Sequence, residues 1–233
     1  MQTTRAAQAV FGLYNNIYNT ASSLLVVGKG SSTSRSNAFK VNDDGNTYAT
    51  KTNNTGADYA EYFEWQDGNP GAEDRIGYVV TLDEDKIRLA QEGEEILGII
   101  SGTAGVVGDS GAMDWQGRFV KDTFGRIIYD EVEEFEEHID PETNETIRVS
   151  LGMTKHPRIS PDYDPEQEYI PREERPEWAC VGMFGKLYVR DDGTCVPNAY
   201  ARCVNGILTY SSERTNIKVM KRTDSNIVYV FLK

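Results

Sequence analysis

Apolar positions along most of the chain alternate with polar ones or form short runs, which is the pattern of β-strands. The amino-terminal end is the exception, because Ala6, Ala7, Val10, Leu13 and Tyr14 are spaced to fall on one face of a helix. We therefore predict a short amino-terminal helix, followed by a structure that is mainly β.

A small polar strip is predicted to follow this helix. Apolar runs at 23–27 and 38–42 predict strands, and the sequence Asp-Asp-Gly-Asn at 43–46 supplies a turn before a third strand at 47–49. A segment this small cannot bury enough apolar surface to be stable by itself. We expect residues 1–56 to be the end of a stalk, stabilised by trimerisation or by packing against a larger body.

A denser β-rich domain is predicted over residues 57–233. Its last run, 227–232, has apolar groups on both faces and predicts a central strand. The stretch 157–176 holds five of the eight prolines and predicts a long surface excursion. Further strands are predicted at 75–82, 95–101, 126–129, 146–149, 179–183 and 186–189.

Charge is distributed unevenly along the chain. The net charge of −13 argues against a nucleic-acid backbone or an anionic membrane surface as the main partner. Residues 1–56 carry +3 and residues 57–128 carry −9, so the sign changes at the predicted domain boundary. Because no apolar run approaches the length of a membrane span, we expect no membrane insertion and no nucleic-acid partner.

Most familiar catalytic patterns fail on spacing. The sequence Gly-Lys-Gly-Ser at 28–31 lacks the spacing of a phosphate-binding loop and is predicted to be a flexible connector. The sequence Gly-Asp-Ser-Gly at 108–111 is predicted to be a plain turn, since His138 and His156 lack the context of a catalytic base. The acidic run 131–137 predicts a solvated face rather than a metal site. Isolated core thiols are predicted at Cys180, Cys195 and Cys203, which form no C-x-x-C pair.

One segment, Thr-Gly-Ala-Asp-Tyr-Ala-Glu-Tyr-Phe-Glu-Trp at 55–65, stands out chemically. It carries three carboxylates among four aromatic residues, where half-burial could raise the pKa of one acid and leave another ionised. On a helix or turn, Asp58 and Glu61 would share a face, whereas on a regular strand they would point in opposite directions. The plain structural alternative is a strand-to-helix entry with the aromatic residues in the core.

Several long motifs, in order, resemble the peptidase G2 family. This family is the autoproteolytic, intramolecular chaperone domain at the carboxyl end of bacteriophage tail spikes and preneck appendage proteins. The likeness covers nearly everything from Gly56 to Lys233, and residues 26–41 look like the strip that joins such domains to the spike shaft. The motifs that carry it lie at 56–65, 67–70, 73–78, 96–101, 167–173, 175–178 and 185–195.

This resemblance implies a module that promotes trimerisation and then cuts its own chain. The family's acidic pair maps onto Asp58 and Glu61, one as general base towards water or the Thr55 hydroxyl and the other as general acid towards the departing amine. Such chemistry requires no cofactor, and regulation by ATP is an expectation from the resemblance alone. The scissile bond is expected within Asn54, Thr55, Gly56, Ala57 and Asp58.

The resemblance also implies partners and a location. The partners would be two further copies of the chain, forming a homotrimer, and the upstream spike shaft. Assembly would take place in the host cytoplasm, and the mature upstream spike would reside in the virion tail. Two alternatives stay open: a structural trimerisation or host-binding tip that never cuts, and cleavage by another nucleophile. The latter would be Asn53 or Asn54 cyclising on its own carbonyl, or a serine–lysine dyad.

Overall fold

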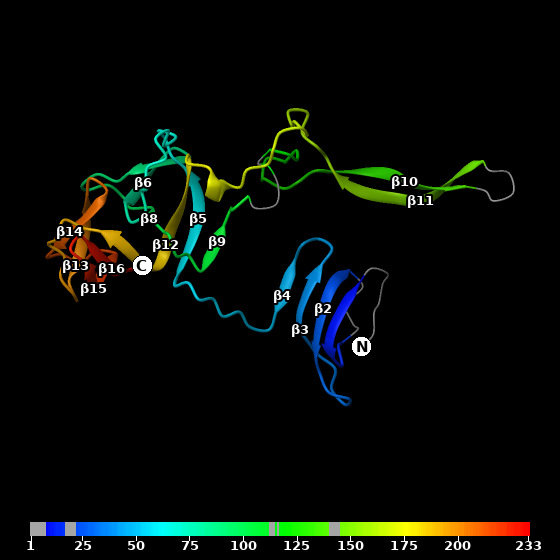
Figure 1. Ribbon diagram of the computed structural model, residues 1–233, viewed down its shortest axis with the longest axis horizontal. Coiled ribbons are helices and arrows are strands. Elements are labelled where there is room, and N and C mark those ends of the chain that lie inside the picture. Colours follow the sequence, from blue (N-terminus) through cyan, green and yellow to red (C-terminus); the bar gives the residue numbers. More distant parts are fainter. Residues whose placement is uncertain (1–7, 17–21, 112–114, 116, 140–144) are drawn as a thin grey trace. The chain divides into compact units, whose positions relative to one another are not determined.

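The structure is a computed structural model that describes residues 8–16, 22–111, 115, 117–139 and 145–233. It divides into two compact units, Met1–Thr55 and Gly56–Lys233, one residue before the boundary expected from the sequence. The regular elements of the described residues are β-strands, apart from one 3₁₀ turn, η1 at Arg172–Glu174 (Figure 1). The prediction of a mainly β chain is therefore confirmed.

The predicted amino-terminal helix is wrong where the structure describes it. Residues Ala9–Leu13 form strand β1, which pairs in parallel with β2 (Ser23–Lys29); the predicted helix positions 6 and 7 lie outside the described residues. Gly12 has a φ of +78°, and a Cβ there would lie 2.1 Å from the carbonyl oxygen of Gly28. Glycine is a poor residue for a helix interior, and here its bare backbone lets the two strands approach closely.

The first unit is a four-stranded sheet in the order β1-β2-β3-β4. Strands β3 (Asn37–Asn42) and β4 (Thr47–Ala49) confirm the predicted strands, and Gly45 in the turn between them has a φ of +82°. The flexible connector predicted at 28–31 is partly wrong, because positions 28 and 29 belong to strand β2. Among the described residues of this unit, Val26 is the one apolar side chain that is buried, so the sheet has almost no core of its own.

The second unit is built on a ten-stranded sheet in which β12 (Trp178–Arg190) pairs with three other strands. This single strand replaces the two that were predicted at 179–183 and 186–189. Strand β16 (Ile227–Leu232) lies between β15 and β12, as expected for a central strand. The other strands are β5 (Asp58–Glu64), β6 (Val79–Asp83), β7 (Lys86–Leu89), β8 (Gly98–Ile100), β9 (Val106–Gly108), β13 (Tyr200–Val204), β14 (Ile207–Ser211) and β15 (Ile217–Asp224).

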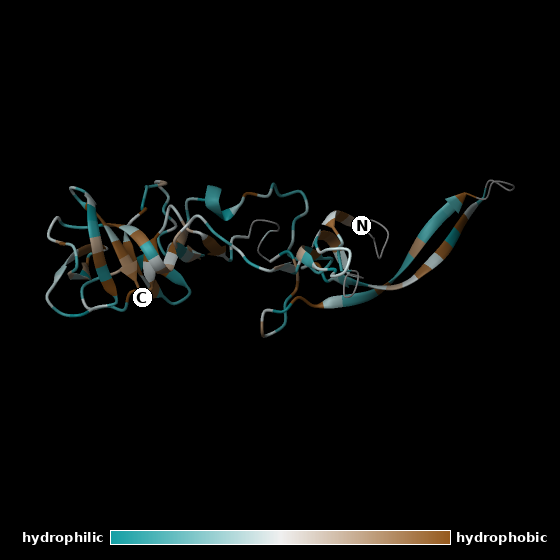
Figure 2. Ribbon diagram, turned by 90° about the horizontal axis from the view of Figure 1, so that it is seen from below, coloured by the Kyte–Doolittle hydropathy of each residue, from teal (hydrophilic) through white to brown (hydrophobic). Residues whose placement is uncertain are grey.

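Two apolar clusters form the core of this unit. The larger one includes Leu187 from β12 and Val230 from β16, and the smaller one gathers around Trp65 and Val181. Figure 2 shows apolar bands along strands of the body that contains the C-terminus. All three cysteines are free thiols, and Cys195 and Cys203 are buried in the larger cluster, which confirms them as core thiols. Cys180 is half-buried and belongs to neither cluster, so the prediction of a core thiol is wrong there.

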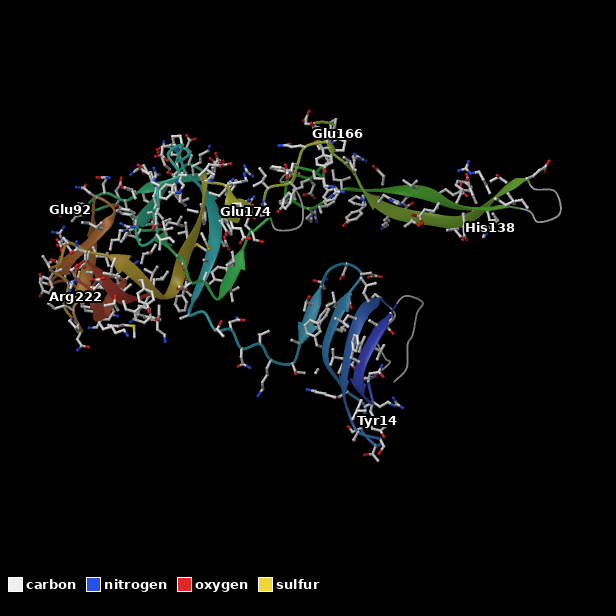
Figure 3. The ribbon with its side chains drawn as sticks, in the orientation of Figure 1. Tyr14, Glu92, His138, Glu166, Glu174 and Arg222 are labelled. Atoms are coloured by element: carbon white, nitrogen blue, oxygen red, sulfur yellow. The ribbon has the colours of Figure 1, made fainter. Side chains whose placement is uncertain are left out.

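Strands β10 (Tyr129–Ile139) and β11 (Thr146–Pro157) form a separate two-stranded hairpin. The predicted solvated acidic face at 131–137 lies on β10, and His138 stands out from the same strand (Figure 3). The stretch 157–176 that follows is mostly irregular, as its prolines predict. Isolated two-stranded hairpins are marginally stable in water. The hairpin nevertheless exposes Tyr129, Val132, Phe135, Ile139, Ile147, Val149, Leu151 and Met153.

One ion pair ties together the end of β12 and the strand β15. The Asp191 carboxylate is fully buried and accepts hydrogen bonds of 2.9 and 2.6 Å from the guanidinium of Arg222, which Figure 3 labels. It also accepts bonds from the backbone N–H groups of Gly193 and Cys195. Both oxygens of the buried carboxylate are thus satisfied.

We predict that Asp191→Ala lowers the free energy of unfolding by about 3–5 kcal/mol, because it leaves the Arg222 charge without its buried partner. Glu92→Ala removes an ion pair with Arg202 in which both side chains are well exposed, and it should cost less than about 1 kcal/mol. Urea unfolding of the two variants measures the difference. Equal losses would contradict the structural importance of the buried pair.

Candidate functional site

The segment that carries the candidate acids is a strand. Asp58–Glu64 forms β5, antiparallel to β12 and parallel to β9. Of the two arrangements considered for Asp58 and Glu61, the structure has the strand, on which side chains three apart point to opposite faces. The alternative of a strand-to-helix entry is wrong, because the strand is followed by a turn and not by a helix. The aromatic residues of the segment suit a pleated surface, and the pairing with β12 holds the backbone extended.

Asp58 faces the interior of the unit. Its exposure is 4%, and within the described part of the chain neither carboxyl oxygen has a hydrogen-bond partner. Space for the carboxyl comes from Gly182 on β12, where a Cβ would lie 2.8 Å from Oδ2 of Asp58. Burial raises the pKa of Asp58, and the nearby Ser101 hydroxyl opposes that shift. The environment of Asp58 thus favours the neutral acid.

The Cys180 thiol lies close enough to Asp58 to respond to its charge. Burial, followed by the Asp58 charge, raises the pKa of Cys180 to about 11. A thiol with this pKa stays protonated at neutral pH and is a poor nucleophile. Cys180 therefore serves as a neutral neighbour of the carboxyl rather than as a second reactive group.

Glu61 lies on the other face of β5 and is half-buried. The Tyr59 hydroxyl donates a hydrogen bond to Oε1 of Glu61, and this bond raises the pKa of Tyr59. Gly108 on β9 lies against the pair, because a Cβ at Gly108 would be 2.9 Å from Cγ of Glu61 and 3.1 Å from the Tyr59 oxygen. Glu61 is thus held by a phenol and by a strand that approaches closely.

The predicted scissile segment enters the second unit just before β5. Asn54, Thr55 and Ala57 are exposed, whereas Gly56 is half-buried. The Ala57 carbonyl accepts a hydrogen bond of 3.3 Å from the backbone N–H of Lys186. The chain therefore changes from exposed to anchored at the predicted cut, and the boundary between the two units falls at Thr55 and Gly56.

A groove of about 440 Å³ opens beside the interior face of this site, with Tyr62, Ser101, Cys180, Arg175 and Trp178 among its lining residues. In the described ranges, no group of three or more His, Cys, Asp or Glu residues is placed to hold a metal ion. The same residues include no helix with the length and apolar character needed to cross a membrane.

Comparison with known proteins matches residues 10–227 to the Peptidase_G2 family model, described as the IMC autoproteolytic cleavage domain. The chain belongs to the Peptidase_G2 family. It is therefore an intramolecular chaperone (IMC) domain of the autoproteolytic type. This finding confirms the resemblance identified from the sequence motifs.

Curated relatives place the family in phage appendage proteins. The chain is 42% identical over 156 residues to the pre-neck appendage protein of Bacillus phage phi29, and 41% identical over 157 residues to that of Bacillus phage B103. Each match covers 67% of this chain and 16% of the relative, so the chain spans about a sixth of their length. It is also 36% identical over 181 residues to the putative phage-related protein YobO of Bacillus subtilis (strain 168), covering 77% of this chain and 20% of that protein.

Two solved structures are similar to the fold. The pre-mature bacteriophage phi29 gene product 12 matches with a TM-score of 0.68 and 32% identity, over 89% of this chain and 26% of that one. The C-terminal fragment of the same gene product matches with a TM-score of 0.56 and 36% identity, over 76% of this chain and all of the fragment. The Peptidase_G2 fold thus exists in both a longer protein and a separate fragment.

Sequence reasoning missed the residues that surround the two acids. These include Ser101 and Gly182 beside Asp58, and Tyr59 and Gly108 beside Glu61. One signal was present: glycine recurs at every third position through 102, 105, 108 and 111. Such a series indicates close backbone approaches. The partner of each approach lies in another strand, which the local sequence does not identify.

We predict that Asp58→Asn changes the pH dependence of stability. Because the pKa of Asp58 is raised above its ordinary value of 3.8, the folded state binds more protons than the unfolded state above about pH 4. The stability of the natural protein should therefore fall relative to that of the variant as pH rises from 4 to 7. Urea unfolding at a series of pH values measures this difference, and a constant difference would contradict burial of the carboxyl.

Proposed function

We propose that this Peptidase_G2 domain assembles an upstream phage or prophage spike shaft into a trimer and then cuts its own chain within residues 54–58. The observation that carries the proposal is the position of this segment. It joins two units at Thr55 and Gly56, and the buried acid Asp58 follows directly. A cut here separates a sheet with almost no core from a unit that has two apolar clusters.

The chemistry proposed is hydrolysis by two carboxyl groups. A water molecule attacks the scissile carbonyl, Glu61 as general base takes the proton of that water, and Asp58 as general acid gives its proton to the amine as the C–N bond breaks. Asp58 suits the role of general acid because burial raises its pKa and so favours the protonated form. The two proton transfers need no cofactor. Each supplies about 10²- to 10⁴-fold, and positioning of the bond supplies much of the rest.

Because Asp58 and Glu61 lie on opposite faces of β5, one chain does not present both to the same bond. We therefore infer that Asp58 acts on the bond of its own chain and that Glu61 of a neighbouring copy completes the pair. This arrangement would make cleavage depend on assembly. Uncut chains would persist until trimers form, as a chaperone requires.

Trimerisation has its own support in the hairpin of β10 and β11. Eight large apolar side chains on it are exposed, although a hairpin of this kind is marginally stable without a covering partner. A neighbouring copy would cover them. Tethering three shaft ends to three such domains would raise their local concentration, and cutting afterwards would make the assembly hard to reverse. Assembly would occur in the host cell, and the released shaft would belong to the virion tail.

We predict that the natural protein yields two fragments whose masses place the cut within 54–58. Asp58→Asn and Glu61→Gln should each stop the cut and keep the assembly intact, since an amide nearly preserves shape but cannot transfer the proton. Glu64→Gln is the matched control on the same strand, because Glu64 pairs with Lys86 at 2.7 Å and should still permit cleavage. Intact-mass measurement on fresh and aged samples of the natural protein and the three variants shows which of them are cut.

Other outcomes identify the alternatives. A single unchanged mass for the natural sequence leaves a structural tip that never cuts. Normal cleavage in Glu61→Gln, with loss in Thr55→Ala or Asn54→Ala, moves the chemistry to a side-chain nucleophile. Misfolding of all three acid variants indicates that the acids serve the core.

Co-expression of Asp58→Asn and Glu61→Gln chains with different tags tests the sharing of the pair between copies. In a mixed assembly the Glu61→Gln chain keeps its own Asp58 and can receive Glu61 from its neighbour. It should therefore be cut, whereas the Asp58→Asn chain should stay whole. If neither chain is cut, both acids must come from one and the same chain, and the sharing of the pair between copies is contradicted.

We also predict that Leu151→Ser and Phe135→Ser weaken the trimer without unfolding the chain, because both side chains are exposed in the single copy. Phe124→Ser is the control, since Phe124 is 82% exposed and lies outside the hairpin. Light scattering across a dilution series should report three chains for the natural protein and the control. A stable monomer of the natural protein at micromolar concentration would contradict the trimer and the chaperone role.

A further inference from the structure

A short segment between β8 and β9, residues 103–105, lies directly against the scissile region. The backbone N–H of Gly105 donates a hydrogen bond of 2.9 Å to the carbonyl of Asp58. A Cβ on Gly105 would lie 2.5 Å from the carbonyl oxygen of Gly56, and a Cβ on Gly56 would lie 2.3 Å from the Cα of Gly105 and 2.7 Å from the Thr103 carbonyl oxygen. Two bare backbones are therefore in contact at the predicted cut.

The contact explains why both positions are glycine. Neither Gly56 nor Gly105 is among the residues with positive φ, so backbone conformation does not demand glycine at either place. The atoms that a Cβ would meet belong to the backbone, which cannot rotate away as a side chain can. What requires glycine here is the closeness of the two chain segments.

The segment is also tied to both candidate acids. Before it, Ser101 lies beside the carboxyl of Asp58 and is held by a 2.8 Å hydrogen bond from its backbone N–H to the carbonyl of Cys180. After it, β9 runs parallel to β5 and brings Gly108 against Glu61. One stretch of chain thus touches the scissile backbone between its contacts with the two acids.

We propose that residues 103–105, through Gly105, position the scissile backbone for cleavage. This inference rests on the proposed self-cleavage and adds a positioning residue to it. Gly105 has no side chain and transfers no proton; it fixes the path of the backbone between Gly56 and Asp58. A displacement of this backbone by about 1 Å is enough to slow a positioned reaction by roughly 100-fold.

The test compares Gly105→Ala with Gly102→Ala in the full chain. The added methyl of Gly105→Ala collides with the scissile backbone, so the first-order rate of cleavage should fall by roughly 100-fold. Gly102→Ala lies in the same loop, but the atoms nearest to its Cβ belong to the flexible side chain of Ile76, the first at 3.2 Å. Its rate should stay within a factor of about three of the natural rate. Intact mass gives the rates, and light scattering gives the assembly.

The pH–rate profile separates positioning from general disruption. Burial raises the pKa of two titratable neighbours of Asp58, Cys180 from β12 and Tyr229 from β16, and the charge of Asp58 adds to both shifts. If Gly105→Ala only displaces the scissile bond, the maximal rate of cleavage falls and the apparent pKa values of the pH–rate profile are unchanged. If it opens the site to water, the apparent pKa of the acid falls towards its ordinary value, and the proposal is overturned.

A second variant covers the case in which Gly105→Ala does not assemble. Insertion of one glycine after Gly102 lengthens the loop without adding a side chain at the contact, and it should slow cleavage in an intact assembly. Failure of both variants to assemble overturns the proposal in favour of a purely structural role. Cleavage of Gly105→Ala at the natural rate overturns this inference alone, whereas absence of cleavage in the natural protein overturns the proposed function itself.

Discussion

The antiparallel pairing of β5 with β12 is the interaction on which the site depends. It pairs Glu61 with Val181 and Ala60 with Gly182, and after an irregularity it pairs Asp58 with Gly185. This register places Asp58 over the space that Gly182 leaves, and it directs Glu61 to the opposite face. A slip by one residue would exchange the two faces. The two glycines of β12 therefore serve the site as much as the sheet does.

The same pairing buries the Asp58 carboxyl, and the free-energy cost of this burial must be offset by the rest of the unit. A carboxyl that is buried with few hydrogen-bond donors is expensive in its charged form, and burial raises its pKa. Asp191 shows the alternative, since that buried carboxylate has Arg222 and two backbone N–H groups as partners. The chain thus contains both solutions to the burial of an acid. Of these two acids, Asp58 is the one with the raised pKa and the one that adjoins the predicted cut, which is the placement expected of a functional group.

Local sequence patterns predicted those parts of the fold whose cause is local. The strand at 227–232 and the hairpin turn around Gly45 follow from alternation and turn chemistry, and both are present. The faces of residues 58–64 follow instead from a partner strand that lies more than 110 residues further along the chain. The amino-terminal helix was mispredicted for a similar reason. The spacing of its apolar residues carries no information about the contact between Gly12 and Gly28. Spacing identified the two acids, whereas tertiary pairing decided how they are arranged.

The position of the proposed cut relative to β5 bears on what would happen to the chaperone afterwards. The strand begins at Asp58, so a cut upstream of it breaks no pairing between β5 and β12. Both apolar clusters lie wholly within the second unit and are not divided either. The released domain would therefore keep its fold, while the strip, with Val26 as its one buried apolar side chain among the described residues, would depend on its partners in the shaft. To reverse the proposed cut, the folded domain would have to bind the separated end again and rejoin it. The end would no longer be held near the domain by a covalent tether, so the cut would be an effectively one-way step in assembly.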